Sequence, residues 1–208
     1  GTTTITAKAK GTTNYQEATA TYTLNVAKKE ITVSGITAEN KYYDKTTNAT
    51  LVCTDAVLTG KADGDDLSVT ATGTFDTANA GKNKTVTISG LTLTGSKAGN
   101  YKLAADSQQT TAAATINKML LTIVRASGIA DKNYDGNAGL SNVTVHFEDV
   151  NQQPVTVGYS INAHFPDADA DETNVDVTLE VTLSSVAAEN YVLTNSPFVV
   201  QNEAKINK

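Results

Sequence analysis

The phrase NKYYDK at residues 40–45 has a near copy, DKNYDG, at residues 131–136. Tyr43 and Tyr134 are 91 positions apart, and other identities recur at an interval of 90. These identities pair Phe75 with Phe165, Asn100-Tyr101 with Asn190-Tyr191, and residues 116–118 with residues 206–208. Self-similarity at a fixed period is the sequence signature of a repeat protein. The sequence therefore predicts two modules, a first module at residues 29–118 and a second module at residues 119–208.

Apolar residues alternate with polar ones inside the matched segments, as expected for strands that bury one face. One alternating segment of the first module has a counterpart in the second. Its inward positions are Val69, Ala71, Gly73 and Phe75, which align with Tyr159, Ile161, Ala163 and Phe165. Alternation also runs unbroken through residues 175–183, whereas the corresponding segment of the first module skips two residues between Ile88 and Leu91. This extra residue predicts a β-bulge at Ser89-Gly90, where glycine tolerates the required backbone angles.

The fold class predicted from these patterns is all-β. Strand-like runs in the first module lie at residues 31–33, 49–53, 56–58, 67–75, 84–93, 101–103 and 110–116. No segment is a convincing helix, and seven short strands separated by Gly, Asn and Asp clusters are typical of a β-sandwich. We expect tandem small antiparallel β-sandwich (Ig-like) modules, end to end, with β-grasp-like modules as the alternative. No Gly/Ser/Pro linker separates Lys118 from Met119, which predicts a semi-rigid junction.

Residues 1–28 read as a strand, a polar loop and a second strand, with Asn14-Tyr15 before the last strand. This order is similar to the end of each later module. We therefore expect residues 1–28 to be the C-terminal strands of a preceding, truncated repeat.

Composition and charge exclude several classes of partner. The formal net charge is −6 without a cluster of Lys and Arg, which argues against nucleic acid as a partner. No run approaches the roughly 18 apolar residues of a membrane span, so no membrane insertion is expected. Cys53 is the single cysteine and cannot form an intramolecular disulfide. Its apolar neighbours predict a small buried side chain rather than a reactive thiol.

The sequence offers little catalytic chemistry. The two histidines, His146 and His164, stand in no recognisable motif, so no catalytic site and no cofactor are predicted. His164 falls on the strand face opposite Ala163 and Phe165, and it should point outward or towards a second layer. A Lys–Asn isopeptide bond would need a buried lysine beside an asparagine and an acid, and no such triplet can be picked from the sequence.

Acidic clusters occur at residues 63–66 and 167–172. Asp167, Asp169 and Asp171 are alternate carboxylates that could supply oxygen ligands to Ca²⁺. The cluster lacks the glycine and distal glutamate of the helix-loop-helix calcium site, so solvated turns and no bound metal are the predicted outcome.

The repeated phrase itself has a structural interpretation. Tyr43 and Tyr134 can bury their rings while each hydroxyl finds a partner. Asp44 and Asp135 can accept hydrogen bonds from the backbone that follows, as in an Asx-turn, and Gly136 permits a positive φ. We predict a structural role for these five residues, with binding as the alternative.

The segments NKYYDKTTNATL, TGTFDTANAGKNKTVTISGLTLTGSKAGNY and TINK resemble the YDG-type repeat modules, related to the MBG-type repeats, of large bacterial cell-surface and adhesin-like proteins. The resemblance covers nearly all of the first module, and in the second module the Tyr-Asp-Gly phrase, Phe165, Asn190-Tyr191 and Lys208. Residues 1–28 resemble the end of a bacterial Ig-like repeat equally well. Lys45 departs from the motif by replacing its glycine, and the second module has Asn137-Ala138 where the usual pair is threonine.

The resemblance implies a non-catalytic extracellular structural repeat, a stalk or spacer that holds another domain away from the cell. Its expected partners are neighbouring repeats of the same chain, and the chain is expected to be a monomer. The alternative is an adhesion module that binds carbohydrate or a host surface protein. Tryptophan, the best platform for stacking sugars, is absent, although exposed tyrosines could substitute. Enzymatic activity ranks third.

Overall fold

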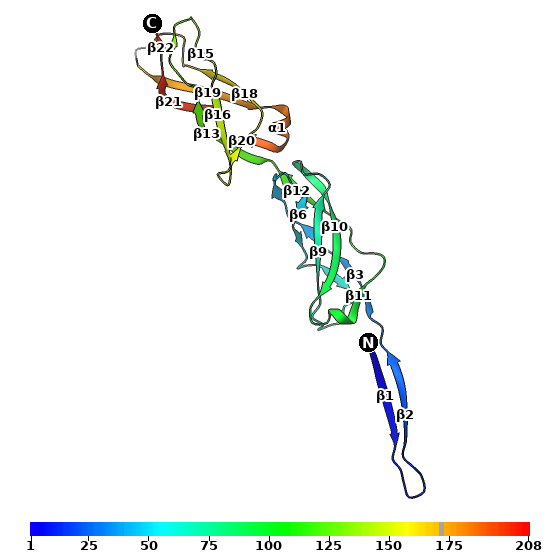
Figure 1. Cartoon of the computed structure of the whole chain (residues 1–208). Helices are drawn as coiled ribbons and strands as arrows, with labels where there is room; N and C mark the ends of the chain where they lie inside the picture. Colours follow the sequence, from blue (N-terminus) through cyan, green and yellow to red (C-terminus); the bar gives the residue numbers. More distant parts are fainter. Residues whose placement is uncertain (171–172) are drawn as a thin grey trace. The chain divides into compact units, whose positions relative to one another are not determined.

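The computed structural model describes residues 1–170 and 173–208, and almost all of its regular structure is β (Figure 1). The all-β prediction is therefore confirmed. The chain divides into two compact units. Unit 1 comprises residues 1–39, 48–75 and 85–113, and unit 2 comprises residues 40–47, 76–84 and 114–208. Three stretches of the first module, residues 40–47, 76–84 and 114–118, thus belong to unit 2.

Unit 1 begins with an antiparallel hairpin of β1 (Thr2–Ala9) and β2 (Ala18–Asn25), which matches the expected order of strand, loop and strand. Every residue of both strands is exposed. Ile5 lies opposite Tyr22 in the ladder, and their side chains are 55% and 68% exposed. A two-stranded ribbon with its apolar face in water is marginally stable.

The core of unit 1 is built on β3 (Lys29–Ser34), which lies between β11 (Tyr101–Leu103) and β8 (Val57–Thr59). β3 pairs in parallel with β11 and antiparallel with β8. The buried residues of this core are Ile31, Val33, Ile36, Leu67, Val69, Ile88 and Tyr101. Cys53 is only half-buried at the edge of this core, so the prediction that its side chain would be buried holds in part.

A five-stranded sheet has the order β5-β12-β10-β9-β6. Its strands are β5 (Lys41–Tyr42), β12 (Thr111–Asn117), β10 (Gly81–Thr94), β9 (Ser68–Phe75) and β6 (Asn48–Ala49). The register between β9 and β10 shifts between Ser89 and Thr92, and Gly90 has a φ of 62°. The predicted bulge is therefore confirmed. A short ladder joins β4 (Thr37–Ala38) to β7 (Leu51–Val52).

Unit 2 contains two four-stranded sheets, of order β17-β16-β13-β20 and β15-β18-β19-β21. The first comprises β17 (Pro154–Val155), β16 (Thr144–Asp149), β13 (Met119–Ser127) and β20 (Tyr191–Leu193). The second comprises β15 (Gly139–Leu140), β18 (Tyr159–His164), β19 (Val175–Leu183) and β21 (Phe198–Ala204). One core takes side chains from both sheets, including Leu121, Ile123, Val145, Phe147, Ala163, Val177, Leu179 and Val181.

The prediction of purely antiparallel modules is wrong in one respect. β13 pairs in parallel with β20, and β3 pairs in parallel with β11. In each module the second strand of the parallel pair, β11 or β20, follows the first only after several other strands. These intervening strands provide the long crossover connection that parallel pairing requires.

The prediction of a chain without helices is wrong at α1 (Ser185–Asn190), whose first turn is capped by the Ser184 hydroxyl accepting from Ala187 N at 3.3 Å. The matching segment of the first module forms only a 3₁₀ turn, η1 (Ala98–Asn100). Gly99 stands there in the place of Glu189. Glycine costs a helix about 1 kcal/mol relative to alanine, which accounts for the difference.

No helix among the described residues has the length and apolar character required to cross a membrane.

Candidate functional site

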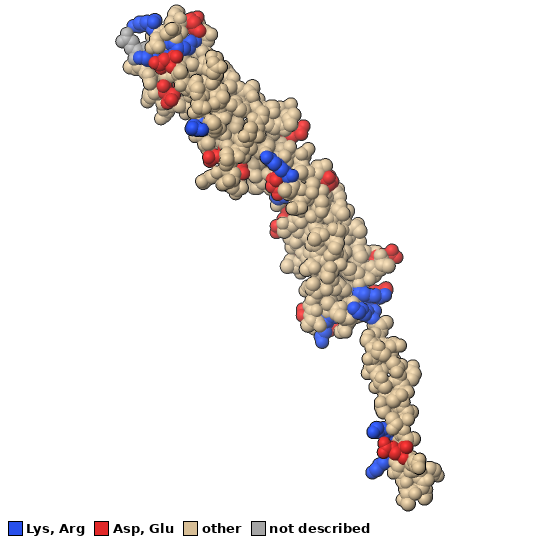
Figure 2. Space-filling model, viewed as in Figure 1, with Lys and Arg blue, Asp and Glu red and all other residues tan. Residues whose placement is uncertain are grey.

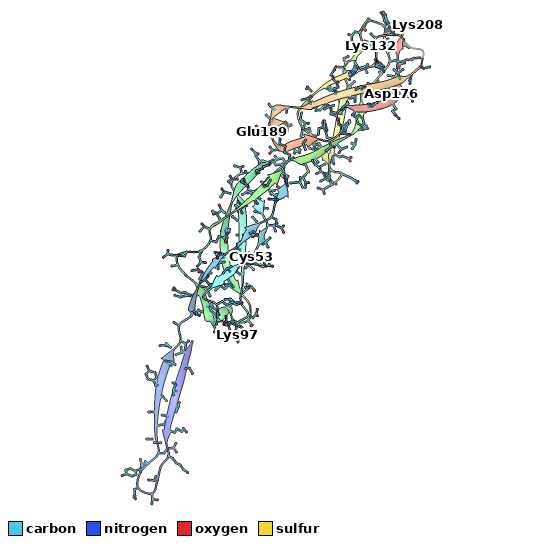
Figure 3. The ribbon with its side chains drawn as sticks, turned by 180° about the vertical axis from the view of Figure 1, so that it is seen from behind. Cys53, Lys97, Lys132, Asp176, Glu189 and Lys208 are labelled. Carbon is cyan, nitrogen blue, oxygen red and sulfur yellow. The ribbon has the colours of Figure 1, made fainter. Side chains whose placement is uncertain are left out.

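Each copy of the repeated phrase forms a turn closed by a lysine. In the second module, Lys132 Nζ donates to Asp135 Oδ1 at 2.7 Å and to the carbonyl of Asn137 at 2.6 Å. Asp135 Oδ1 also accepts from the backbone N–H of Asn137 at 3.0 Å, so the predicted Asx-turn is present. The ammonium group therefore bridges the carboxylate and the backbone of the same turn. Figure 3 shows Lys132 near Lys208, at one end of residues 119–208.

The first module repeats this arrangement. Lys41 Nζ donates to Asp44 Oδ1 at 2.8 Å and to the Thr46 carbonyl at 2.9 Å, and Thr46 N donates to Asp44 Oδ1 at 2.9 Å. The side chains of Lys41 and Lys132 are only 19% and 16% exposed. We call this arrangement the lysine clamp, formed by Lys41 and Asp44 or by Lys132 and Asp135. Neither lysine was among the predicted motif residues, although a lysine stands three residues before the aspartate in both phrases.

The residue after each aspartate has a left-handed backbone. Gly136 has a φ of 77° and Lys45 a φ of 67°. The left-handed region is open to glycine but costs other residues roughly 1–2 kcal/mol. Lys45, the departure from the family motif, thus holds a conformation that strains its backbone.

The clamp also fixes the charge of its aspartates. Partial burial alone would raise the pKa of Asp44, but hydrogen bonds from Lys41 and Thr46 outweigh burial and hold this pKa below its ordinary value. The hydrogen bond from Lys132 holds the pKa of Asp135 below its ordinary value. Both carboxylates are therefore ionised partners of a lysine at neutral pH.

The clamp turn is joined to the segment that closes each module. In the first module Ile116 lies beside Lys41 in the parallel pair of β12 and β5, and Tyr43 N donates to the Asn117 carbonyl at 2.8 Å. In the second module β22 (Ile206–Asn207) pairs in parallel with β14 (Lys132–Asn133), and Tyr134 N donates to the Asn207 carbonyl at 2.9 Å. This pairing explains why the motif and the closing Ile-Asn-Lys segment recur together.

The two motif tyrosines differ in their surroundings. The ring of Tyr43 meets the ring of Tyr191 edge-on, with centroids 5.3 Å apart and planes at 82°. Tyr134 is 58% exposed, so its ring is not part of the core, contrary to the burial considered from the sequence. Tyr43, Tyr191 and Tyr134 all belong to unit 2.

The acidic cluster at residues 63–66 is more than a solvated turn. The Tyr101 hydroxyl donates a short hydrogen bond to the Asp65 carboxylate and accepts from Ala62 N at 3.1 Å. The bond to Asp65 raises the pKa of Tyr101. Asp66 Oδ2 accepts from Ser96 N at 2.8 Å, and this bond lowers the pKa of Asp66. These carboxylates fasten the loop to the segment around η1.

The structure describes only part of the second acidic cluster, whose carboxylates were the candidate ligands for Ca²⁺. Asp169 N donates to Asp167 Oδ1 at 2.9 Å, which is the geometry of an Asx-turn. Asp171 lies outside the described residues. Within residues 1–170 and 173–208, no group of three or more His, Cys, Asp or Glu side chains is arranged to hold a metal ion.

The two histidines lie in different surroundings. His146 Nε2 is exposed, 3.3 Å from both Arg125 Nη2 and Ser127 Oγ. His164 is half-buried, and its Nδ1 lacks a hydrogen-bond partner among the described residues.

The surface grooves among the described residues include two that differ in their lining. One, of about 550 Å³ in unit 1, is lined by Cys53, Ala56, Leu58, Lys61 and Asp63 and contains no aromatic ring. The other, of about 310 Å³ in unit 2, is lined by Tyr43, Asp44, Asn151 and Tyr191 among others. Burial, followed by the charge of Asp149, raises the pKa of Tyr191. We call the second one the tyrosine groove. Elsewhere, charged side chains are scattered over the visible face (Figure 2).

The fold and the site define a β protein with an internally repeated lysine-clamped turn. The model of the YDG domain family matches residues 27–112 and again residues 117–197, which together make up most of the chain. The chain therefore belongs to the YDG domain family. No curated protein and no solved structure is similar enough to the chain to count as a match.

Proposed function

We propose that this chain is a non-catalytic extracellular structural repeat, a stalk or spacer in a bacterial surface or secreted adhesin-like protein. The observation that carries this proposal is the lysine clamp. In both modules the charged groups of the family motif are used inside their own turn, where Lys41 and Lys132 bond the neighbouring aspartate and backbone carbonyls. A motif whose polar groups are satisfied internally serves the fold rather than a substrate.

The proposal includes tandem Ig-like sandwich modules and an extracellular location. The shared core between two sheets of unit 2 supports the sandwich interpretation. The resemblance to surface repeats supports the location.

The test of location uses antibodies against residues 1–208 on cells that produce the protein. Intact cells should be stained, and external protease should remove the signal while a cytoplasmic marker survives. Staining that requires lysis of the cells would refute the location. A second arm replaces residues 29–208 by unrelated β-modules of the same length. Retained display of the attached domain is expected of a spacer, and loss of display would contradict it.

The second candidate function is adhesion through carbohydrate binding, and the tyrosine groove favours it. Tyrosine rings can stack on sugars, and Asp44 and Asn151 supply polar groups beside them. A glycan array should then show selective binding that Asn151→Ala weakens. Gln201→Ala, which lines a different surface groove, is the matched control. Absence of saturable binding to any glycan would remove this candidate.

A further inference from the structure

Asn190 is the only buried polar residue among the described part of the chain, with 8% of its surface exposed. It lies at the end of α1 in unit 2. Its side-chain Oδ1 accepts from Ala80 N at 2.8 Å, and its Nδ2 lies 3.5 Å from Asn79 Oδ1. Asn79 and Ala80 belong to the first module, in the stretch 76–84 of the same unit. A buried amide with a backbone partner gives the contact a defined geometry.

Two surfaces meet here, which we name by their residues. The Asn–Tyr surface consists of residues 185–191 of the second module. The motif surface consists of Tyr43 and residues 79–80 of the first module. Their contact combines the Asn190 hydrogen bonds with the edge-on ring pair of Tyr43 and Tyr191. Lys118 Nζ adds a short hydrogen bond to the Ala188 carbonyl.

Each module carries the sequence counterpart of both surfaces. The counterpart of Tyr43 in the second module is Tyr134, which is 58% exposed. The loop that corresponds to residues 79–80 is at residues 169–170, by the 90-residue interval. In the first module the counterpart of Asn190 is Asn100, which is exposed. Asn190 is thus buried and Tyr43 half-buried where the surfaces meet, whereas Asn100 and Tyr134 are exposed. The other two counterparts differ: Asp169 stands in the place of Asn79, and Tyr101, the counterpart of Tyr191, is buried in the core of its own module.

We infer that the motif surface of the second module, formed by Tyr134 with residues 169–170, binds the Asn–Tyr surface of another YDG module. The occupant is defined by its chemistry: an asparagine at the end of a short helical turn, followed by a tyrosine whose ring meets Tyr134 edge-on. The contact around Asn190 and Tyr191 is the precedent within this chain. Figure 3 places Glu189, on α1, and Lys132, beside Tyr134, at opposite ends of residues 119–208, so one module can use both surfaces at once.

This inference goes beyond the proposed spacer role, because it assigns the YDG tyrosine to recognition between modules. It also holds wherever the protein is located, so failure of the staining experiment would leave it standing.

The test exploits the absence of tryptophan from the chain. Tyr134→Trp introduces a single fluorophore at the uncovered surface. It is compared in the 208-residue chain and in a chain extended after Lys208 by a second copy of residues 119–208. Binding of the added copy should shift the emission to the blue and lower the acrylamide quenching constant by roughly half, because it would cover a side chain that is now 58% exposed.

The matched control is an extended chain whose added copy carries alanine at the counterparts of Asn190 and Tyr191. Its quenching should return to that of the 208-residue chain. Equal quenching in all three chains would overturn the inference. Protection that survives the two alanines would overturn the assignment of these residues.

A second measurement remains decisive if the added copy does not fold. Tyr43→Trp in the 208-residue chain should be protected from acrylamide, and Asn190→Ala with Tyr191→Ala should abolish that protection. If the fluorophore at position 43 is quenched equally in both backgrounds, the precedent fails and the inference with it.

Discussion

Gly136→Ala isolates the backbone strain of the YDG turn. Gly136 has a φ of 77°, and a Cβ built on it meets no heavy atom within 4 Å. The substitution therefore adds no clash, and its cost is the strain of the left-handed conformation alone. Alanine also lowers the conformational entropy of the unfolded chain, which offsets part of this strain. The net loss in the free energy of unfolding should be about 1 kcal/mol. Lys45→Gly is the reciprocal change, because Lys45 has a φ of 67° without being glycine. It should stabilise the protein by roughly 0.5–1 kcal/mol.

Denaturation in guanidinium, followed by far-UV circular dichroism, measures both changes. Gly99→Ala is the matched control. Gly99 also has open space around its Cβ position, but its φ is not positive. The control should be neutral or slightly stabilising. The reasoning is refuted if Gly136→Ala is as harmless as Gly99→Ala, or if Lys45→Gly destabilises the protein.

Three further predictions concern the clamp, the tyrosines and the hairpin. Lys132→Met should lower the melting temperature at pH 7, and part of this loss should disappear in acid. The pKa of Asp135 is lowered in the folded protein, so the ionised carboxylate contributes its full stabilisation above the ordinary pKa of 3.8. This stabilisation is lost as the pH falls through the folded-state pKa. A penalty identical at pH 7 and pH 2 would contradict the assignment. Tyr134→Ala should change stability little in the 208-residue chain, whereas Tyr101→Ala, at a side chain only 4% exposed, should cost about 3 kcal/mol; equal losses in urea denaturation would contradict this contrast. Backbone amides of β1 and β2 should exchange with deuterium much faster than those of β9 and β10, because both hairpin strands are fully exposed; equal protection would show that the hairpin is covered in solution.

Local patterns in the sequence predicted the strands and the bulge because each depends on neighbouring residues. The skipped position between Ile88 and Leu91 was sufficient to place the register shift beside Gly90. The helix α1 was missed because six residues are too few for a periodic pattern, and its stability depends on the Ser184 cap.

The lysine clamp and the contact of Asn190 were missed for a different reason. Side-chain partners depend on how the turn closes, and the sequence shows only that Lys132 stands three residues before Asp135. Asn190 was seen as a repeat identity with Asn100, yet only the fold shows that one is buried and the other exposed. Burial of a polar group is decided by what packs over it, which no single repeat encodes.

The parallel pairing of β13 with β20 has a mechanical consequence. Met119 is paired with Tyr191 at the start of the second module, whereas Lys208 lies at the far end of that module, near Lys132 (Figure 3). A pull on the two ends of residues 119–208 acts along β13. It loads the hydrogen bonds to β20 in shear, all together, instead of opening them one at a time like a zipper. The closing pair of β22 with β14 is likewise parallel. Tension applied across residues 119–208 is therefore met by a parallel pair of strands at each end of the module.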